Sequence, residues 1–179
     1  MPAYIALLRA VNVGGTGKLP MADFRKLLVN LGYRNVETYI QSGNAVFDSP
    51  GTAAKVTAAV SAGLEKLLSN PVGVLLRTHD QLTQLIAANP YAAEAAADGA
   101  RVHAVFLSAV PAESAIPGLA KIPARRDRYH VVGDTLYLHL PDGAGETKFT
   151  TKTLDRLFGV TTTGRNWNTV LKLHAMSKR

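Results

Sequence analysis

The loop between Arg9 and Lys18 follows an apolar stretch and carries three glycines, one asparagine and two cationic side chains. Glycine adopts positive φ at little cost, so such a loop can turn several backbone N–H groups toward one point. Pro20 begins a segment with helical spacing, and a helix N-terminus adds positive potential there. The pattern is typical of a site for phosphate or carboxylate. The candidate ligand-binding residues of this loop are Arg9, Asn12, Gly14, Gly15 and Lys18.

Neither of two familiar phosphate-binding motifs occurs in this loop. The P-loop spacing Gly-x4-Gly-Lys-Ser/Thr and the dinucleotide spacing Gly-x-Gly-x-x-Gly are both missing. The loop therefore predicts an anion site without naming the anion. The alternative is a glycine-rich connection that is needed only for its turn.

A second polar stretch, Gln41-Ser42-Gly43-Asn44, lies between two apolar segments that are predicted to be strands. The tight turn of a hairpin needs a glycine, but it does not need flanking Gln and Asn. Their amides could recognise the edge of a base or a sugar, or they could hold the hairpin closed. Gln41, Ser42 and Asn44 are candidate ligand-binding residues on the first alternative.

The connection Pro141–Lys148 joins a predicted strand to a predicted helix, with Lys148 at its end. Such a connection could form a second cradle of backbone N–H groups for an anion. The alternative is a long linker without a ligand. Lys148 is a candidate ligand-binding residue on the first alternative.

A third polar stretch precedes the last predicted helix and contains the only tryptophan of the chain. Asn166 or Thr163 could cap that helix. Arg165 and Trp167 could offer a cation and a stacking face to a base, whereas docking of the helix on the core is the alternative for Trp167. Burying an unpaired charge is costly, so Arg165 fits an ion pair or an anion contact. The candidate ligand-binding residues here are Arg165, Asn166 and Asn168.

Catalytic residues and metal ligands do not emerge from the sequence. The five histidines are scattered, and none forms a pair such as His-x3-His, so we expect no metal site and no cofactor. The chain has no cysteine, which excludes disulfides, a thiol nucleophile and a thiolate metal site. No Ser or Thr has an evident His/Asp partner, and no carboxylate pair stands out.

The formal charge of +7 is uneven, because residues 121–179 contain eleven Lys and Arg against five Asp and Glu. A basic segment favours a polyanionic or phosphorylated partner, whereas solubility alone is the alternative. Arg125-Arg126-Asp127-Arg128 is read as a solvated turn, or alternatively as a nucleic-acid patch. No apolar run reaches the roughly 18 residues of a membrane span, and the first residues lack the pattern of a signal peptide. We expect a cytoplasmic protein without a membrane partner.

The first half of the chain reads as β-α-β-β-α-β. Strands are expected at 3–9, 36–41, 44–47 and 72–77, with helices from Pro20 to Gly32 and from Thr52 to about Leu68. This order is the split βαβ, or ferredoxin-like, arrangement. We assign it to a subdomain of residues 1–78.

The second half repeats most of this order after a helix and an Ala-rich connection at 79–100. Strands are expected at 102–107, 129–132 and 135–140, and helices at 111–121, 147–158 and 166–176, with Pro117 shortening or kinking the first helix. Residues 101–179 therefore read as a second, βαββα-type unit with a C-terminal helix where a sixth strand would stand. The fold class is α+β. The second half can be interpreted as a degraded copy of the first, on element order alone.

Several separated stretches of unusual sequence occur in one order along the chain. They are Ala6-Leu7-Leu8-Arg9, Asn12-Val13-Gly14-Gly15, Lys18 with Pro20-Met21, Thr38-Tyr39-Ile40-Gln41-Ser42-Gly43-Asn44, and Arg165-Asn166-Trp167-Asn168-Thr169 with Lys172-Leu173. Together they resemble the bacterial domain-of-unknown-function family DUF1697 over nearly the whole chain. The family typically has Gly-Ile where this chain has Ala10-Val11, and often another Thr in place of Gly164. The resemblance implies an α+β fold with a ferredoxin-like unit, and no established activity.

Three functions are compatible with these patterns. The first is a binding module for a small anionic, phosphorylated or nucleotide-like ligand. The second is nucleic-acid binding through the basic C-terminal segment, and the third is an enzyme acting on a phosphorylated substrate. Polar loop residues that core packing would not require favour the first. We expect the Arg9–Lys18 loop, the Gln41–Asn44 turn and the Arg165–Asn168 stretch to line one cleft or face.

Overall fold

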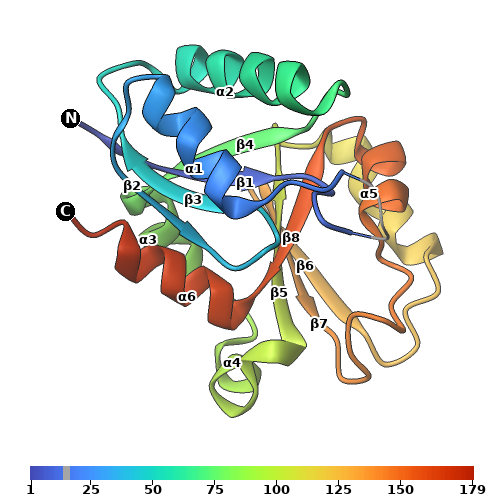
Figure 1. Ribbon diagram of the computed structural model, residues 1–179. Coiled ribbons are helices and arrows are strands. Elements are labelled where there is room, and N and C mark those ends of the chain that lie inside the picture. The colour runs from blue at the N-terminus through green and yellow to red at the C-terminus, as the bar shows by residue number, and fades with distance from the viewer. Residues whose placement is uncertain (14–16) are drawn as a thin grey trace. The chain divides into compact units, whose positions relative to one another are not determined.

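Two four-stranded antiparallel sheets, each with helices, make up the α+β fold of the computed structural model, which describes residues 1–13 and 17–179 (Figure 1). The chain divides into two units. The first contains Met1–Thr83 and Lys172–Arg179, and the second contains Gln84–Leu171. The predicted ligand-binding residues Gly14 and Gly15 lie outside the described residues.

The first unit has the predicted β-α-β-β-α-β order. Its strands lie in the order β2-β3-β1-β4 and pair antiparallel throughout. Its elements are β1 (Ala3–Leu8), α1 (Met21–Asn30), β2 (Arg34–Tyr39), β3 (Asn44–Asp48), α2 (Ala53–Leu68) and β4 (Val74–Thr78).

The helices of the first unit begin where local chemistry favours a start. Thr52 caps α2, because its hydroxyl accepts a hydrogen bond from the N–H of Lys55 at 3.4 Å. Pro20 directly precedes α1 and has extended backbone, one residue before the helical position that the sequence predicts for it. Phe24 of α1 and Val60 of α2 are fully buried in one apolar cluster with Leu8 of β1. The hydrophobic face of each helix is thus what holds it on the sheet.

The second unit repeats this strand order as β6-β7-β5-β8. Its elements are α4 (Ala92–Ala97), the 3₁₀ turn η1 (Gly99–Arg101), β5 (Val102–Leu107), the 3₁₀ segment η2 (Glu113–Lys121), β6 (Arg128–Val132), β7 (Thr135–His139), α5 (Thr151–Phe158) and β8 (Thr162–Asn166). Two helices run across the division of the chain: α3 (His79–Ala87) begins in the first unit, and α6 (Trp167–Met176) ends in it.

The second unit corrects the predicted βαββα order, because its sixth element counted from β5 is a strand, β8, which is the fourth strand of its sheet. β8 pairs antiparallel with β5, in a register that places Gly164 opposite Val105. Its sequence, Thr-Thr-Gly-Arg-Asn, lacks the apolar alternation by which strands are recognised, so its pairing partner rather than its own pattern makes it a strand.

Two predicted helices of the second unit also differ from those observed. The segment around Pro117 is a 3₁₀ helix, since proline has no N–H for an α-helical bond. α5 begins at Thr151 rather than at Thr147, because Thr150 caps it by accepting from the N–H of Thr153. Phe149 is buried ahead of the cap, in a cluster with Leu138 and Leu154.

Candidate anion-binding site

The Arg9–Lys18 loop leaves the first sheet from the end of its central strand β1. The N–H of Leu8 donates to the carbonyl of Gly43 at 2.9 Å, and the N–H of Arg9 donates to the carbonyl of Gly73 at 2.8 Å. Gly43 directly precedes β3, and Gly73 directly precedes β4. The loop is therefore anchored between the beginnings of two neighbouring strands.

Asn12 closes the described part of the loop from within. Its Nδ2 donates to the carbonyls of Leu19 at 2.8 Å and Gln41 at 2.7 Å, while its Oδ1 accepts from the N–H of Leu19 at 2.8 Å. Both amide hydrogens of this predicted ligand-binding residue are thus used within the protein. The same contacts join the loop to the Gln41–Asn44 turn, so two of the three predicted polar stretches lie together.

Left-handed backbone is concentrated in this region. Ala10 has φ of 56°, Asn12 of 56° and Gly17 of 60° in the loop, and Ile40 has φ of 48° at the turn. This conformation disfavours Ala and, more strongly, a β-branched residue such as Ile. At the position of Ala10, where the resemblance indicates Gly, the chain makes the tight turn in spite of the side chain.

The turn between β2 and β3 is closed by its own side chains. Asn44 is fully buried, and its Nδ2 donates to the carbonyl of Tyr39 at 3.1 Å and to Oγ of Ser42 at 2.9 Å. Gly43 has φ of 85°, and a Cβ there would lie 2.6 Å from Cγ2 of Val11. Gln41 is exposed and receives Asn12 on its backbone carbonyl. These contacts are those of the alternative in which the amides hold the hairpin closed.

A hollow of about 600 Å³ opens beside the loop. Arg9 is half-buried and Lys18 is exposed at its wall, and the residues after α2 form the other side. The described residues that line it are Arg9, Ala10, Gly17, Lys18, Leu68, Asn70, Pro71, Val72 and Gly73. Two of them are cationic and none is acidic, so the wall favours an anion.

Arg165 belongs to the second unit, where it is buried on β8 with 6% of its surface exposed. Its Nη1 donates to Oγ1 of Thr163 at 2.7 Å and to the carbonyl of Gly164 at 2.8 Å. Burial lowers the pKa of Arg165 to about 10, because removal from water disfavours the charged form. This guanidinium is held by the strand that carries it.

The other predicted residues of the second unit have separate surroundings. Asn166 caps α6, because its Oδ1 accepts from the N–H of Thr169 at 3.0 Å. Asn168 is exposed, with its Oδ1 against Gly99, and Lys148 is exposed before α5. Trp167 is buried, and its ring centroid lies 6.4 Å from that of Tyr137, as expected if it docks the helix. A face shared by these residues and the Arg9–Lys18 loop stays a prediction.

Arg77, which is not among the predicted site residues, occupies in β4 the place that Arg165 occupies in β8. Arg77 is buried with 8% of its surface exposed, and its Nη1 donates to the carbonyl of Leu76 at 2.9 Å. Each arginine therefore bonds back to the residue before it, and each is followed by a residue that caps the next helix. The sequence signal was an arginine directly before a capping Thr or Asn at the end of a strand.

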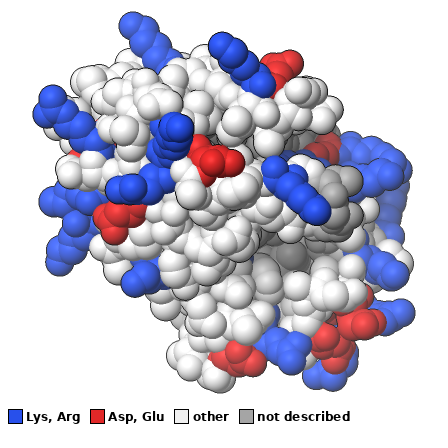
Figure 2. Space-filling model, viewed as in Figure 1, with Lys and Arg blue, Asp and Glu red and all other residues white. Residues whose placement is uncertain are grey.

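Several cations of the basic segment are in ion pairs. Arg126 pairs with Asp142 at 2.9 Å, and Arg128 pairs with Glu94. On the face in Figure 2, Lys and Arg side chains are interspersed with Asp and Glu. In the described ranges, 1–13 and 17–179, we find no group of three His, Cys, Asp or Glu side chains arranged to hold a metal ion. Nor does any helix within these ranges have the length and apolar character to span a membrane.

Comparison with known proteins gives a family and a fold. The family described as "Protein of unknown function (DUF1697)" matches residues 1–137. Among solved structures, the chain is similar to the conserved bacterial protein SP0830 from Streptococcus pneumoniae, with a TM-score of 0.77 and 23% identity over 99% of each chain. No curated protein matches the sequence.

Proposed function

Since the chain belongs to the DUF1697 family, whose description names no activity, we propose its function from the geometry of the loop site: the first unit binds a small anionic, phosphorylated or nucleotide-like ligand beside the Arg9–Lys18 loop. The observation that carries the proposal is the hollow of about 600 Å³ with two cations and no carboxylate among its described lining residues. Ligand pockets commonly measure about 300–1,000 Å³.

The two cations suit different parts of such a ligand. The planar guanidinium of Arg9 can hold two oxygens of a phosphate or carboxylate at once, whereas the ammonium of Lys18 acts as a point charge. The left-handed Ala10 and Ile40 support a functional role for the region, because strained backbone tends to gather at binding sites. The lining residues that the structure describes include no carboxylate, imidazole or thiol to act as general base, so we propose binding rather than a reaction.

Isothermal titration with inorganic phosphate, pyrophosphate and adenosine monophosphate tests the proposal. We expect saturable binding of at least one probe, and a loss of about tenfold in affinity, or ~1.4 kcal/mol, for Arg9→Gln and for Lys18→Gln. Lys55→Gln is the matched control, because Lys55 is an exposed cation on α2 outside the lining of the hollow. Equal losses in all three variants, or no saturable binding of any probe, contradict the proposal.

The same titration tests the predicted residues of the second unit. Lys148 is the most accessible cation among them, so Lys148→Gln removes a charge with little effect on packing. An affinity loss as large as that of Arg9→Gln would add Lys148 to the site, together with the prediction that Arg165, Asn166 and Asn168 share it. Unchanged affinity would confine the site to the first unit.

Nucleic-acid binding through the basic segment is distinguished by its salt dependence. A protein that neutralises several phosphates loses affinity steeply as salt rises, whereas a small dianion in a built site shows a shallower slope. Retention of an oligonucleotide that falls steeply with salt, and that Arg9→Gln leaves unchanged, would replace the small-ligand proposal with the nucleic-acid alternative.

A further inference from the structure

Two stacked histidines hold the end of the chain on the first unit. His79 begins α3 and His174 lies in the last turn of α6, with ring centroids 4.3 Å apart and ring planes 14° from parallel. The segment Lys172–Arg179, which contains His174, belongs to the first unit as His79 does. The stack is therefore a contact between segments almost a hundred residues apart in the sequence.

Two hydroxyl groups determine which nitrogen of each neutral ring carries its proton. The Ser177 hydroxyl donates to the carbonyl of His174 at 2.8 Å, so its oxygen accepts from Nδ1 of His79 at 2.9 Å. The Thr83 hydroxyl donates to the carbonyl of His79 at 3.1 Å, so its oxygen accepts from Nε2 of His174 at 2.8 Å. Each ring can gain a second proton only by acquiring charge.

The surroundings disfavour a positive charge on His174. Burial, then the neighbouring His79, then Lys178 lower the pKa of His174 from its ordinary value. Lys178 and Arg179 add positive charge from the same segment, whereas Asp80 on α3 is the acidic residue beside them. Arg179 is itself paired with Glu37 and Asp48, each at 3.3 Å. Like charges at stacking distance repel each other, so the second protonation opposes the contact.

We propose that the His79–His174 stack is a pH-dependent clasp, which holds Lys172–Arg179 on the first unit at neutral pH and loosens in mild acid. His174 binds its proton more weakly in the folded state than in the unfolded state, because its pKa is lowered. By linkage, the contact is therefore stabilised at neutral pH and weakens as pH falls below about 6.5. The ion pairs of Arg179 with Glu37 and Asp48 involve neither imidazole. They keep the segment attached while the stack opens.

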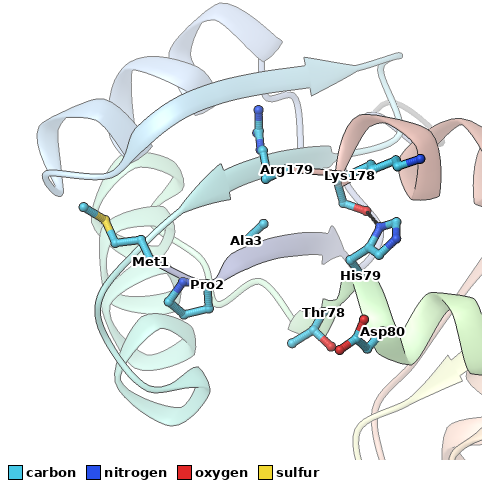
Figure 3. Close-up of a pocket in the computed structure, with 9 residues that line it drawn as sticks. Met1, Pro2, Ala3, Thr78, His79, Asp80, Lys178 and Arg179 are labelled. Carbon is cyan, nitrogen blue, oxygen red and sulfur yellow. Dashed lines mark hydrogen bonds between the residues drawn. The ribbon is translucent and has the colours of Figure 1, made fainter.

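Loosening of the clasp would change a second hollow in the first unit. This hollow, of about 450 Å³, is lined by residues 1–3, 78–80 and 177–179. Figure 3 shows His79 and Lys178 together at one side of it, with Met1 and Pro2 at the other. Because Ser177, Lys178 and Arg179 form part of the wall, movement of the segment would open the hollow.

Imidazole NMR titration and amide hydrogen exchange of the whole chain test the clasp. We expect the His174 ring to titrate with a pKa below the ordinary value of histidine, because of its burial and the neighbouring His79 and Lys178. Amide protection in residues 172–179, corrected for intrinsic exchange, should fall about tenfold or more between pH 7.5 and pH 5.0. Protection in β1 and β3 should change much less over the same range.

Two variants separate the clasp from general acid sensitivity. His174→Phe keeps an aromatic ring but removes the charge, so residues 172–179 should lose most of their pH dependence. His130→Phe is the matched control, because His130 is exposed on β6, and it should leave the pH dependence unchanged. An ordinary histidine pKa for His174 in the wild-type chain, or the same fall in protection in His174→Phe, would overturn the proposal. The wild-type titration decides the question if His174→Phe does not fold.

Discussion

The two units share one order of strands and differ in the connection that follows the strand β1 or β5. In each, the central strand is anchored by two equivalent bonds: Leu8 to Gly43 and Arg9 to Gly73 in the first, and Leu107 to Asp134 and Ser108 to Thr161 in the second, at 2.8 to 2.9 Å. In the first unit, the connection from β1 to α1 consists of Arg9–Pro20. In the second unit, the shorter connection from β5 to η2 consists of Ser108–Ala112.

The difference separates residues required by packing from residues available for binding. Left-handed positions occur in the first connection at Ala10, Asn12 and Gly17, whereas none is found at 108–112. The second unit forms the same sheet without such a connection. The strained, cationic loop of the first unit is therefore not needed to form the four-stranded sheet. This makes the loop the better candidate for function.

In both units, a glycine on one helix allows close contact with a leucine on the other. A Cβ on Gly63 of α2 would lie 2.7 Å from Cδ1 of Leu27 on α1, and a Cβ on Gly118 of η2 would lie 2.4 Å from Cδ1 of Leu157 on α5. In the first unit the second helix supplies the glycine, and in the second unit the first helix does. The close approach is common to both units, while the residues that provide it are exchanged.

We expect the largest loss of stability at the first residue of a helix that follows a fourth strand. The two such residues are Trp167 of α6 and His79 of α3. Trp167 of α6 is buried against Tyr137, whereas His79 of α3 is only partly buried. Trp167→Ala should lower the free energy of unfolding by about 3–5 kcal/mol, as loss of a large core side chain does. His79→Ala should cost less than half as much in the same urea titration. Little loss of stability in Trp167→Ala, with a loss of ligand binding, would assign the ring to stacking instead.

The next effect compares the glycines of the two hairpin turns. Both Gly43 and Gly133 have positive φ, but a Cβ on Gly43 would clash with Leu8 and Val11, while a Cβ on Gly133 would meet nothing within 4 Å. Gly43→Ala should cost about 3 kcal/mol from overpacking and backbone strain together. Gly133→Ala should cost about 1–2 kcal/mol from backbone strain alone. Thermal and urea unfolding measure both, and equal losses would show that the closed turn can relax.

A smaller effect compares the caps of α3 and α6. Oγ1 of Thr78 accepts from the N–H of Gln81 at 3.2 Å, and Oδ1 of Asn166 accepts from the N–H of Thr169 at 3.0 Å. Thr78→Ala and Asn166→Ala should each cost about 1 kcal/mol, because each leaves one helix N–H without its partner. Oε1 of Gln81 also accepts from the N–H of Thr78 at 2.9 Å, which completes a capping box in α3. A much larger loss in Asn166→Ala would indicate a role beyond capping.

The smallest expected change in the free energy of unfolding has opposite signs in the connection after β1 and in the connection after β5. Ala10 has φ of 56° and Ala112 has φ of −60°. Ala10→Gly should raise the free energy of unfolding by about 0.5–1 kcal/mol, because it relieves left-handed strain at the usual entropic cost of glycine. Ala112→Gly should lower it by about 0.5–1 kcal/mol, because only the entropic cost applies. Destabilisation by both variants would mean that Ala10 is not strained.

Local sequence patterns were sufficient for much of the first unit. The apolar spacing of Phe24 and Leu28 and the cap at Thr52 locate α1 and α2, because a helix needs one buried face and a satisfied N-terminus. In the second unit, Pro117 predicts an irregular helix, because proline has no backbone N–H to donate. The loop from Arg9 and the turn at Gly43 are likewise visible as glycine-rich breaks between apolar strands.

The tertiary structure decided what depends on partners distant in the sequence. β8 is a strand because β5 offers its edge, and Asn12 is a brace because Leu19 and Gln41 present their carbonyls to it. From the sequence, Arg165 fits an ion pair or an anion contact, and only the folded chain shows that it is buried beside Thr163 and Gly164. Local propensity depends on neighbouring residues, so it records helices, caps and turns. Strand pairing, burial of a charge and the stacking of His79 on His174 depend on which segments the folded chain brings together.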